Sequence, residues 1–345
     1  MTTTTSSLAD RYAALKEADP KLRMRDCADR LGVTEGELVA ADCGCQSIRL
    51  KVESWIGIIE ELKALGRVMV LTRNEHCVHE RKGCYEQISS HNGKIGLVVG
   101  KDIDLRLFFA DWAHAYAVTA PSRGQELKSI QFFDRYGNAI HKVYPKEESK
   151  MSVYEELIAR LRHEDQDSPM TVESQPAKKE AEPVDEERKE KFMDGWANLK
   201  DTHDFFMLMA KNKVSRLQAM ELGEGKFTRR LENDAARRLL EQARDKEMPI
   251  MVFVGNDSAI QIHTGTVSKL VIFEDWFNVL DPDFNLHLKE SGIASSWHVV
   301  KPTDDGDVNA VELYDAEGEI IAQFFGARKP GIPEREDWRE LAAQL

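Results

Sequence analysis

Residues 68–83 (VMVLTRNEHCVHERKG) and residues 250–265 (IMVFVGNDSAIQIHTG) are two versions of one pattern. Each contains an apolar run, a turn that begins with asparagine, and a second run that ends in glycine. Met69 and Met251 are 182 positions apart (251 − 69), and a shared valine, asparagine and glycine keep that spacing. Four identities in one register indicate an internal repeat, and alternating runs on both sides of a turn predict a β-hairpin in each copy.

The repeat extends outward from these hairpins. Residues 133–137 (FDRYG) correspond to residues 314–318 (YDAEG), and residues 102–106 (DIDLR) correspond to residues 283–287 (DFNLH), each at a spacing of 181 (315 − 134, 287 − 106). Because the spacing is nearly constant over most of the chain, we predict a duplicated domain. The differences between its copies then indicate where function lies.

A charged, proline-containing stretch at residues 163–190 has few large apolar side chains and is predicted to be an acidic linker, because it cannot bury enough surface to offset its ordering entropy. The predicted domains are the N-terminal repeat, residues 1–162, and the C-terminal repeat, residues 191–345. In each copy, helical segments come first and short alternating runs follow. Strands separated from helices predict the α+β class, with an internal duplication in which each half is a large antiparallel β-sheet with helices packed on it.

Alternation and turn residues locate the strands. The predicted strands are residues 68–72, 94–99, 105–109, 129–133 and 139–143 in the first copy, and residues 250–254, 259–263, 269–273, 286–288, 296–300, 310–314 and 320–325 in the second.

Composition restricts the class of protein. With 31% charged and 42% hydrophobic residues, the 345-residue chain has the balance of a soluble globular protein. No apolar run approaches the roughly 20 residues that span a bilayer, and the N-terminal stretch lacks a secretory signal, so we expect a cytoplasmic protein without membrane insertion. A net charge of −13 disfavours DNA binding. The five cysteines, an odd number, suit a reducing compartment.

Residues 200–206 (KDTHDFF) carry the strongest chemical signal. Asp201 or Thr202 is a predicted helix N-cap, which places His203 in the first helical turn. The positive end of the helix dipole disfavours imidazolium, and the neutral imidazole is the form that ligates metal. A histidine beside aromatic residues would suit a flat apolar ligand with a central metal. The alternative is a half-buried histidine packed against the linker.

Basic residues in the second copy form a second signal. Arg216 follows a helix, Lys301 follows a strand, and Arg328 lies just beyond Phe325 at the end of the last strand. On an acidic protein, cations near aromatic residues indicate a place for the carboxylates of an apolar ligand. Ordinary surface charge is the alternative for each of them.

Arg106 is the third candidate. It follows a turn and enters a β-run, so its side chain could project from a sheet face, and its counterpart in the second copy is His287. A salt bridge to Asp102 or Asp104 is the alternative.

Two further motifs have weaker support. Cys43 and Cys45, with His76, Cys77 and His79, resemble a zinc site, but the cysteine spacing is too short, and the second copy forms the same hairpin without these residues. Residues 25–41 resemble a helix-turn-helix, but the second helix lacks side chains that read bases. Nucleotide-binding, α/β-hydrolase and zinc-protease motifs are absent from the sequence.

Together these features resemble the cytoplasmic haemin-degrading and haemin-transport family of HemS/ChuS type. The segments that carry the resemblance are LKDTHDFF (199–206), VSRLQA (214–219), NVLDPDFNLHL (278–288), FFGARKPG (324–331) and GKDIDLRLFF (100–109).

The resemblance implies a haem cleft formed mainly by the C-terminal repeat, with the N-terminal repeat covering the distal face of the haem. In that comparison His203 matches the axial iron ligand, and Arg106 matches the catalytic arginine of the distal face. The residues that match pocket positions are Arg216, Lys301, Phe325 and Arg328. The three basic ones would contact propionates, and Phe325 replaces a tyrosine that some relatives carry.

The resemblance also implies a function in bacterial haem uptake. Haem b would be both substrate and cofactor, degraded oxidatively to release iron with electrons from an external donor. The alternative is a storage and trafficking chaperone that passes haem to a separate oxygenase without turnover of its own. The implied partners are haem, a haem ABC transporter, and a reductase or a separate haem oxygenase, while the pairing of chains into a homodimer stays open.

Overall fold

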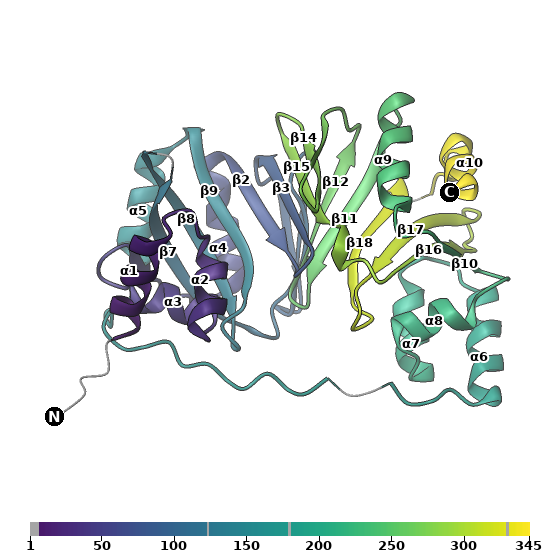
Figure 1. Ribbon diagram of the computed structural model, residues 1–345, viewed down its shortest axis with the longest axis horizontal. Coiled ribbons are helices and arrows are strands. Elements are labelled where there is room, and N and C mark those ends of the chain that lie inside the picture. The colour runs from purple at the N-terminus through teal and green to yellow at the C-terminus, as the bar shows by residue number, and fades with distance from the viewer. Residues whose placement is uncertain (1–6, 123, 179–180, 329–330) are drawn as a thin grey trace. The chain divides into compact units, whose positions relative to one another are not determined.

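The computed structural model describes residues 7–122, 124–178, 181–328 and 331–345 (Figure 1), in which one order of α-helices and strands occurs twice. The elements of the first copy are α1 (Leu8–Ala18), α2 (Met24–Leu31), α3 (Glu35–Ala41), β1 (Ser47–Arg49), α4 (Trp55–Leu62), η1 (Lys63–Leu65), β2 (Gly66–Arg73), β3 (Cys77–Gly83), β4 (Gln87–His91), β5 (Ile95–Val99), β6 (Asp104–Phe108), β7 (Trp112–Ser122), β8 (Gln125–Asp134), β9 (Ala139–Ser149) and α5 (Met151–Leu161). The elements of the second copy are α6 (Glu186–Ala197), α7 (Asp204–Asn212), α8 (Arg216–Leu222), β10 (Thr228–Leu231), α9 (Ala235–Asp245), β11 (Ile250–Asn256), β12 (Ala259–Gly265), β13 (Leu270–Phe273), β14 (Trp276–Leu280), β15 (Phe284–Lys289), η2 (Glu290–Gly292), β16 (Ser295–Lys301), β17 (Val308–Tyr314), β18 (Ile320–Gly326) and α10 (Glu336–Gln344).

In the described part of the chain the strands form two nine-stranded sheets. Their orders are β1-β7-β8-β9-β2-β3-β15-β14-β13 and β10-β16-β17-β18-β11-β12-β6-β5-β4. The second order is the first with every strand replaced by its counterpart in the other copy. The predicted class, a duplicated α+β fold with large antiparallel sheets and packed helices, is confirmed. Each sheet contains strands of both copies, a feature that was not predicted.

The chain divides into two compact units. Unit 1 comprises Met1–Thr72, Arg81–Pro176 and Asn256–Ile260, and unit 2 comprises Arg73–Glu80, Ala177–Gly255 and Gln261–Leu345. The tip of each long hairpin therefore belongs to the unit that is built mainly from the other copy.

The asparagines shared by the two hairpins close these tips. Asn256 Oδ1 accepts hydrogen bonds from the backbone N–H groups of Ser258 and Ala259. Its Nδ2 donates to the Ile140 carbonyl at 2.9 Å. Asn74 repeats the arrangement in unit 2, where its Nδ2 donates to the Ile321 carbonyl at 2.8 Å. Ile140 and Ile321 are themselves 181 positions apart (321 − 140). The asparagine that the two copies share in sequence thus has the same role in both turns, because its side chain pairs backbone groups there.

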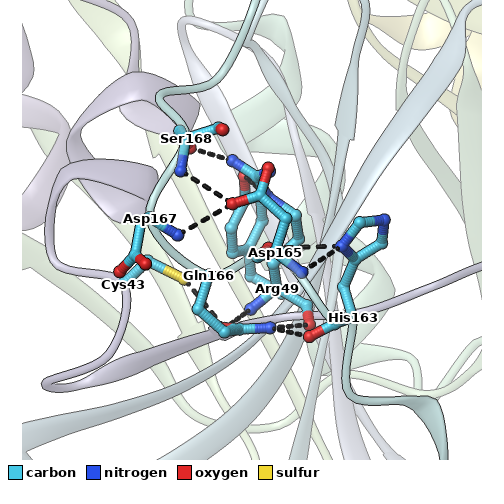
Figure 2. Close-up of polar contacts among 8 residues, drawn as sticks. Cys43, Arg49, His163, Asp165, Gln166, Asp167 and Ser168 are labelled. Atoms are coloured by element: carbon cyan, nitrogen blue, oxygen red, sulfur yellow. Dashed lines mark hydrogen bonds and ion pairs between the residues drawn. The ribbon is translucent and has the colours of Figure 1, made fainter.

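The first part of the predicted linker is held against β1 (Figure 2). Gln166 Oε1 accepts from the Arg49 backbone N–H at 2.9 Å and from the Cys43 thiol at 3.1 Å, and its Nε2 donates to the carbonyls of Arg49 and His163. The Arg49 guanidinium donates to Asp165 at 3.3 Å. These bonds explain why the segment up to Pro176 belongs to unit 1 despite its polar composition.

The far end of the linker also differs from the sequence-based boundary. Helix α6 begins at Glu186, inside the stretch 163–190, because Asp185 caps it by accepting from the Arg188 backbone N–H at 2.8 Å. Residues 179–180 of the linker lie outside the described part of the chain.

Among the described residues, no helix combines the length and apolar character needed to cross a bilayer. The region that resembles a helix-turn-helix forms α2 and α3, but α3 buries Gly36, Leu38, Val39 and Ala40. Most of that short helix is therefore committed to packing within unit 1.

A buried histidine in unit 1 makes stability depend on pH. His141 is 1% exposed, and its ring nitrogens contact the Thr72 hydroxyl at 2.9 Å and the Tyr85 hydroxyl at 3.0 Å. Burial lowers the pKa of His141 to about 3 from 6.5, so the folded state favours the neutral ring. Its contribution is fully present above about pH 6.5 and is lost as the pH falls toward 3, at roughly 1.4 kcal/mol per pH unit.

We therefore expect the free energy of unfolding of unit 1 to fall by about 2 kcal/mol between pH 7 and pH 5 through this residue. Urea unfolding of wild type and His141→Gln at both pH values measures it. The variant should lose this part of the pH dependence. An equal dependence in both proteins would contradict the assignment.

Candidate functional site

The sequence predicted His203 inside the first turn of a helix. In the structure α7 begins at Asp204, so His203 lies immediately before the helix, although its φ and ψ of −70° and −24° are helical. The predicted N-cap at Asp201 or Thr202 is wrong, because His203 itself occupies that position and its side chain makes no capping hydrogen bond. Asp201 stabilises the preceding turn instead: its Oδ1 accepts from the His203 backbone N–H at 2.8 Å, and its own N–H donates to Asp204 Oδ2 at 3.2 Å. The turn is thus closed by side-chain bonds at both ends.

The imidazole of His203 contacts Asp201 through one ring nitrogen and is otherwise exposed. Its Nδ1 lies 2.5 Å from Asp201 Oδ1, and its side chain is 88% exposed. The pKa of Asp201 is lowered, first by the hydrogen bond from the His203 backbone N–H, so its carboxylate is ionised and accepts the Nδ1 proton. In a neutral imidazole that donates from Nδ1, the Nε2 lone pair is available to a metal, and a carboxylate behind the ring is the usual support for a histidine ligand.

Apolar side chains follow His203 on both faces of α7. Phe205 and Met209 are buried, and the Phe205 ring lies 4.5 Å from the ring of Trp196. Phe206 and Met207 are instead 68% and 66% exposed, among the most exposed large apolar side chains of the described residues. An exposed apolar pair beside an exposed histidine is the surface that a flat hydrophobic ligand would cover.

The basic residues Arg216 and Lys301 converge on a carboxylate that the sequence-based reasoning missed, Glu312 on β17. Glu312 is fully buried. Arg216 donates to both of its oxygens, Nε to Oε2 and Nη2 to Oε1, each at 3.2 Å. Lys301 Nζ donates to Oε1 at 2.9 Å. Tyr314 and Gln323 complete the shell, at 2.6 Å from the hydroxyl to Oε2 and 2.9 Å from Nε2 to Oε1.

Electrostatics keeps this cluster ionised. Burial alone would raise the pKa of Glu312, but Arg216 and Lys301 more than offset it and hold that pKa well below its usual range. Burial lowers the pKa of Lys301, and the Glu312 carboxylate opposes this effect. Two basic side chains, Arg216 and Lys301, thus share a single acidic partner, an excess of donors that favours an anionic ligand group.

The two copies have different ion pairs at the equivalent positions. At a spacing of 181 the positions of Arg216, Glu312 and Gln323 correspond to Glu35, Gln131 and Lys142. In unit 1 the Lys142 ammonium pairs directly with the Glu35 carboxylate. The second copy instead has a central carboxylate between two cations. Comparing the two copies in sequence at this spacing was the signal that could have identified Glu312.

Phe325 and Arg328 lie at the end of β18 and just beyond it. The Phe325 ring is 5.1 Å from that of Phe253 and 6.0 Å from Lys301 Nζ. Arg328 Nη1 is buried and has no hydrogen-bond partner among the described residues. Arg328 also contributes to lowering the pKa of Asp201. Arg328 is thus a cation near the His203 turn, and one of its N–H groups has no acceptor among the described residues. Lys329 and Pro330, which follow it in the sequence motif, lie outside the described part of the chain.

Arg106 lies on β6 in unit 1, whereas the other five predicted site residues lie in unit 2. Its Nη1 pairs with the Asp104 carboxylate and donates to the Leu105 carbonyl at 3.1 Å. The salt bridge considered from the sequence is therefore present.

The donor set of unit 2 fits a haem. In the described residues, no group of three or more His, Cys, Asp and Glu side chains is arranged to hold a metal ion. A haem iron needs one protein ligand at an axial position, because the porphyrin supplies the equatorial nitrogens. His203 with a free Nε2, exposed Phe206 and Met207, and the unpartnered Nη1 of Arg328 meet the needs of iron, ring and carboxylate in turn.

Comparisons with known proteins identify the family of the chain. The sequence profile described as "Haemin-degrading HemS.ChuX domain" matches residues 32–161 and again residues 213–345. The chain is 37% identical to the hemin transport protein HmuS of Yersinia pestis, over 99% of this chain and 97% of that one.

Solved structures give the same result. The holo form of PhuS, a heme-binding protein from Pseudomonas aeruginosa, superposes with a TM-score of 0.94 at 47% identity and 98% coverage of both chains. The heme degrading enzyme ChuS of Escherichia coli O157:H7 superposes with a TM-score of 0.91 at 33% identity and 99% coverage of both. The chain belongs to the HemS/ChuX family of haemin-degrading domains, and it carries the domain twice.

Proposed function

We propose that this protein binds one haem through unit 2 and degrades it oxidatively, releasing the iron. The observation that carries the proposal is the exposed His203, whose Nδ1 is bonded to Asp201 and whose Nε2 is free. The bound haem would supply both the porphyrin to be cleaved and the redox-active iron, with electrons from an external donor. Relatives named for haemin transport and for haem degradation support haem as the ligand.

The residues of the site would act in distinct ways. Asp201 orients His203 and raises the basicity of its Nε2. Phe206 and Met207 cover one side of the ring and exclude water from it. Arg328, and the net positive cluster of Arg216 and Lys301, attract the propionates. Arg106, matched to the family's distal arginine, would stabilise negative charge that develops during ring cleavage.

A second candidate function is haem trafficking. It is favoured by the bonding of Arg106, whose guanidinium is already paired with Asp104 and is less available to an oxygen ligand. A relative of 47% identity is described as a heme-binding protein, without mention of degradation. In this function the same pocket would hold haem and release it intact to a separate oxygenase.

A turnover assay separates the two functions. The haem complex is mixed with ascorbate, or with NADPH and a reductase, and the Soret band is followed in the presence of catalase. Degradation predicts bleaching with appearance of a linear tetrapyrrole and iron that a chelator can trap. A stable Soret band under reductant, with complete transfer of haem to an added haem oxygenase, would establish trafficking instead.

Arg106→Ala should keep haem affinity but slow bleaching by roughly 10²-fold, the usual cost of removing one donor that stabilises developing charge. Arg81→Ala is the matched control, because Arg81 also pairs with an aspartate of unit 1, Asp102, at 2.6 Å. Single-turnover rates of both variants measure the effect. Equal bleaching rates in wild type and Arg106→Ala would remove Arg106 from the reaction.

A further inference from the structure

We propose that Glu312 is a positioning residue of the haem site: it holds Lys301 and Arg216 in place and, through Lys301, sets the turn that carries His203. This inference rests on the function proposed above. It concerns a residue that touches neither the iron ligand nor an exposed surface, so its effect on haem would be indirect.

Glu312 has the bonding of a structural hub. Its side chain is completely buried on β17. Four side chains donate to it: Arg216 from α8, Lys301 from β16, Gln323 from β18 and Tyr314 from β17 itself. Both oxygens are used, Oε2 by Arg216 Nε and the Tyr314 hydroxyl, and Oε1 by Lys301, Gln323 and Arg216 Nη2. A buried carboxylate with this many charge-assisted donors is rigid, and it transmits that rigidity to its partners.

Lys301 connects the hub to the His203 turn. Its Nζ lies 4.8 Å from the centroid of the Phe205 ring, a cation–π contact with the residue two places after His203. Phe205 packs at 4.5 Å against Trp196, whose Nε1 donates to the carbonyl of Val300, the neighbour of Lys301, at 3.0 Å. The start of α7 is thus held from two directions by β16, and the position of Lys301 on that strand is set by Glu312.

The charge of Lys301 depends on the same carboxylate. The lysine side chain is 5% exposed, and its pKa is lowered by burial. The groups that face it are Glu312, the like-charged Arg216 and the rings of Phe205 and Phe325. Glu312 is the one anion among them, so without it the buried ammonium would have burial and Arg216 against it.

The first copy supports this interpretation. The position of Glu312 is occupied by Gln131, and the position of Lys301 is occupied by Ala120 (301 − 181). A central carboxylate therefore occurs in the copy that has two cations to hold, and a neutral amide occurs in the copy that has one ion pair.

Glu312→Gln tests the proposal, because it keeps the shape and removes the charge. Haemin titrated into the folded variant should bind about 10- to 100-fold more weakly than into wild type, the usual effect of losing an outer partner of a metal site. Its Soret band and EPR signal should report a mixture of coordination states. The haemin Kd of the variant should also rise with increasing pH more steeply than that of wild type, as Lys301 loses its proton.

Two controls isolate the cause. Glu35→Gln removes the carboxylate of an ion pair with similarly buried side chains in unit 1 and should leave the haemin Kd unchanged. Lys301→Met in the Glu312→Gln background should abolish the added pH dependence, because the titrating group is gone.

Tyr314→Phe is the milder variant if Glu312→Gln does not fold. Phe133 occupies the equivalent position in the first copy. This variant removes one donor to Glu312 and should weaken haemin binding and mix the coordination states as Glu312→Gln does, to a smaller extent.

A purely structural role predicts a lower melting temperature with wild-type Kd, Soret band and pH profile, and that result would overturn the proposal. Failure of the proposed function has a different signature, because wild-type protein would then not bind haemin at all, or would bind it equally well without His203.

Discussion

His203→Ala should abolish the wild-type Soret spectrum of the haemin complex and weaken haemin binding by at least 10²-fold, which corresponds to about 3 kcal/mol. The imidazole of His203 is exposed immediately before α7, and its Nε2 is the ring nitrogen that would coordinate iron. Residual binding would come from the apolar surface and the basic residues, and would give a weak, shifted band. Absorbance titration and resonance Raman spectroscopy of the iron–histidine stretch measure both effects.

Two companion variants sharpen this test. Asp201→Asn keeps His203 but weakens the hydrogen bond to its Nδ1, so haemin affinity should fall by roughly 10- to 100-fold with the histidine still bound. His91→Ala removes another exposed histidine, on β4, and should change nothing. A His203→Ala spectrum identical to wild type would show that a different residue holds the iron.

Trp196→Ala should destabilise unit 2 by about 3–5 kcal/mol and loosen the helices that carry the site. Trp196 is fully buried on α6, where it stacks on Phe227 at 5.0 Å and contacts Phe205 at 4.5 Å. Its Nε1 bond to the Val300 carbonyl would also be lost, which leaves a polar backbone group unpaired. We expect faster hydrogen exchange in residues 186–222 and a haemin affinity that falls with it.

A half-buried aromatic residue of the first copy provides the control for this variant. Tyr12 lies on α1, so Tyr12→Ala should cost distinctly less. Unfolding is followed separately for the two units, because a chain with two units does not unfold as a two-state system. Equal losses from the two variants would contradict the central packing role given to Trp196.

Much of the fold could be predicted from the sequence. The two hairpins, the antiparallel sheets and the order of helices before strands all follow from local alternation, turn residues and the repeat. The predicted strand ranges omit β1, β3, β4, β7, β10 and β14, and for two of these a local reason is clear. β7 is rich in alanine and contains Pro121, and β4 is a short polar edge strand with exposed side chains. Neither shows the apolar alternation that identifies a strand.

The site divides in the same way. His203 with Asp201 is a local motif, and its bonding depends on residues within three positions of each other, so the sequence alone could predict it. Glu312 could not be predicted locally, because Arg216 is 96 positions away (312 − 216) and Lys301 is 11 positions away on a neighbouring strand. Only the pairing of β16, β17 and β18 and the docking of α8 bring these charges together in a dry interior. The sequence by itself determined the duplication and the candidate iron ligand. The tertiary structure decided which cations are bound to an internal carboxylate and which, like Arg328, have a donor without a partner among the described residues, since that depends on burial and contact across strands.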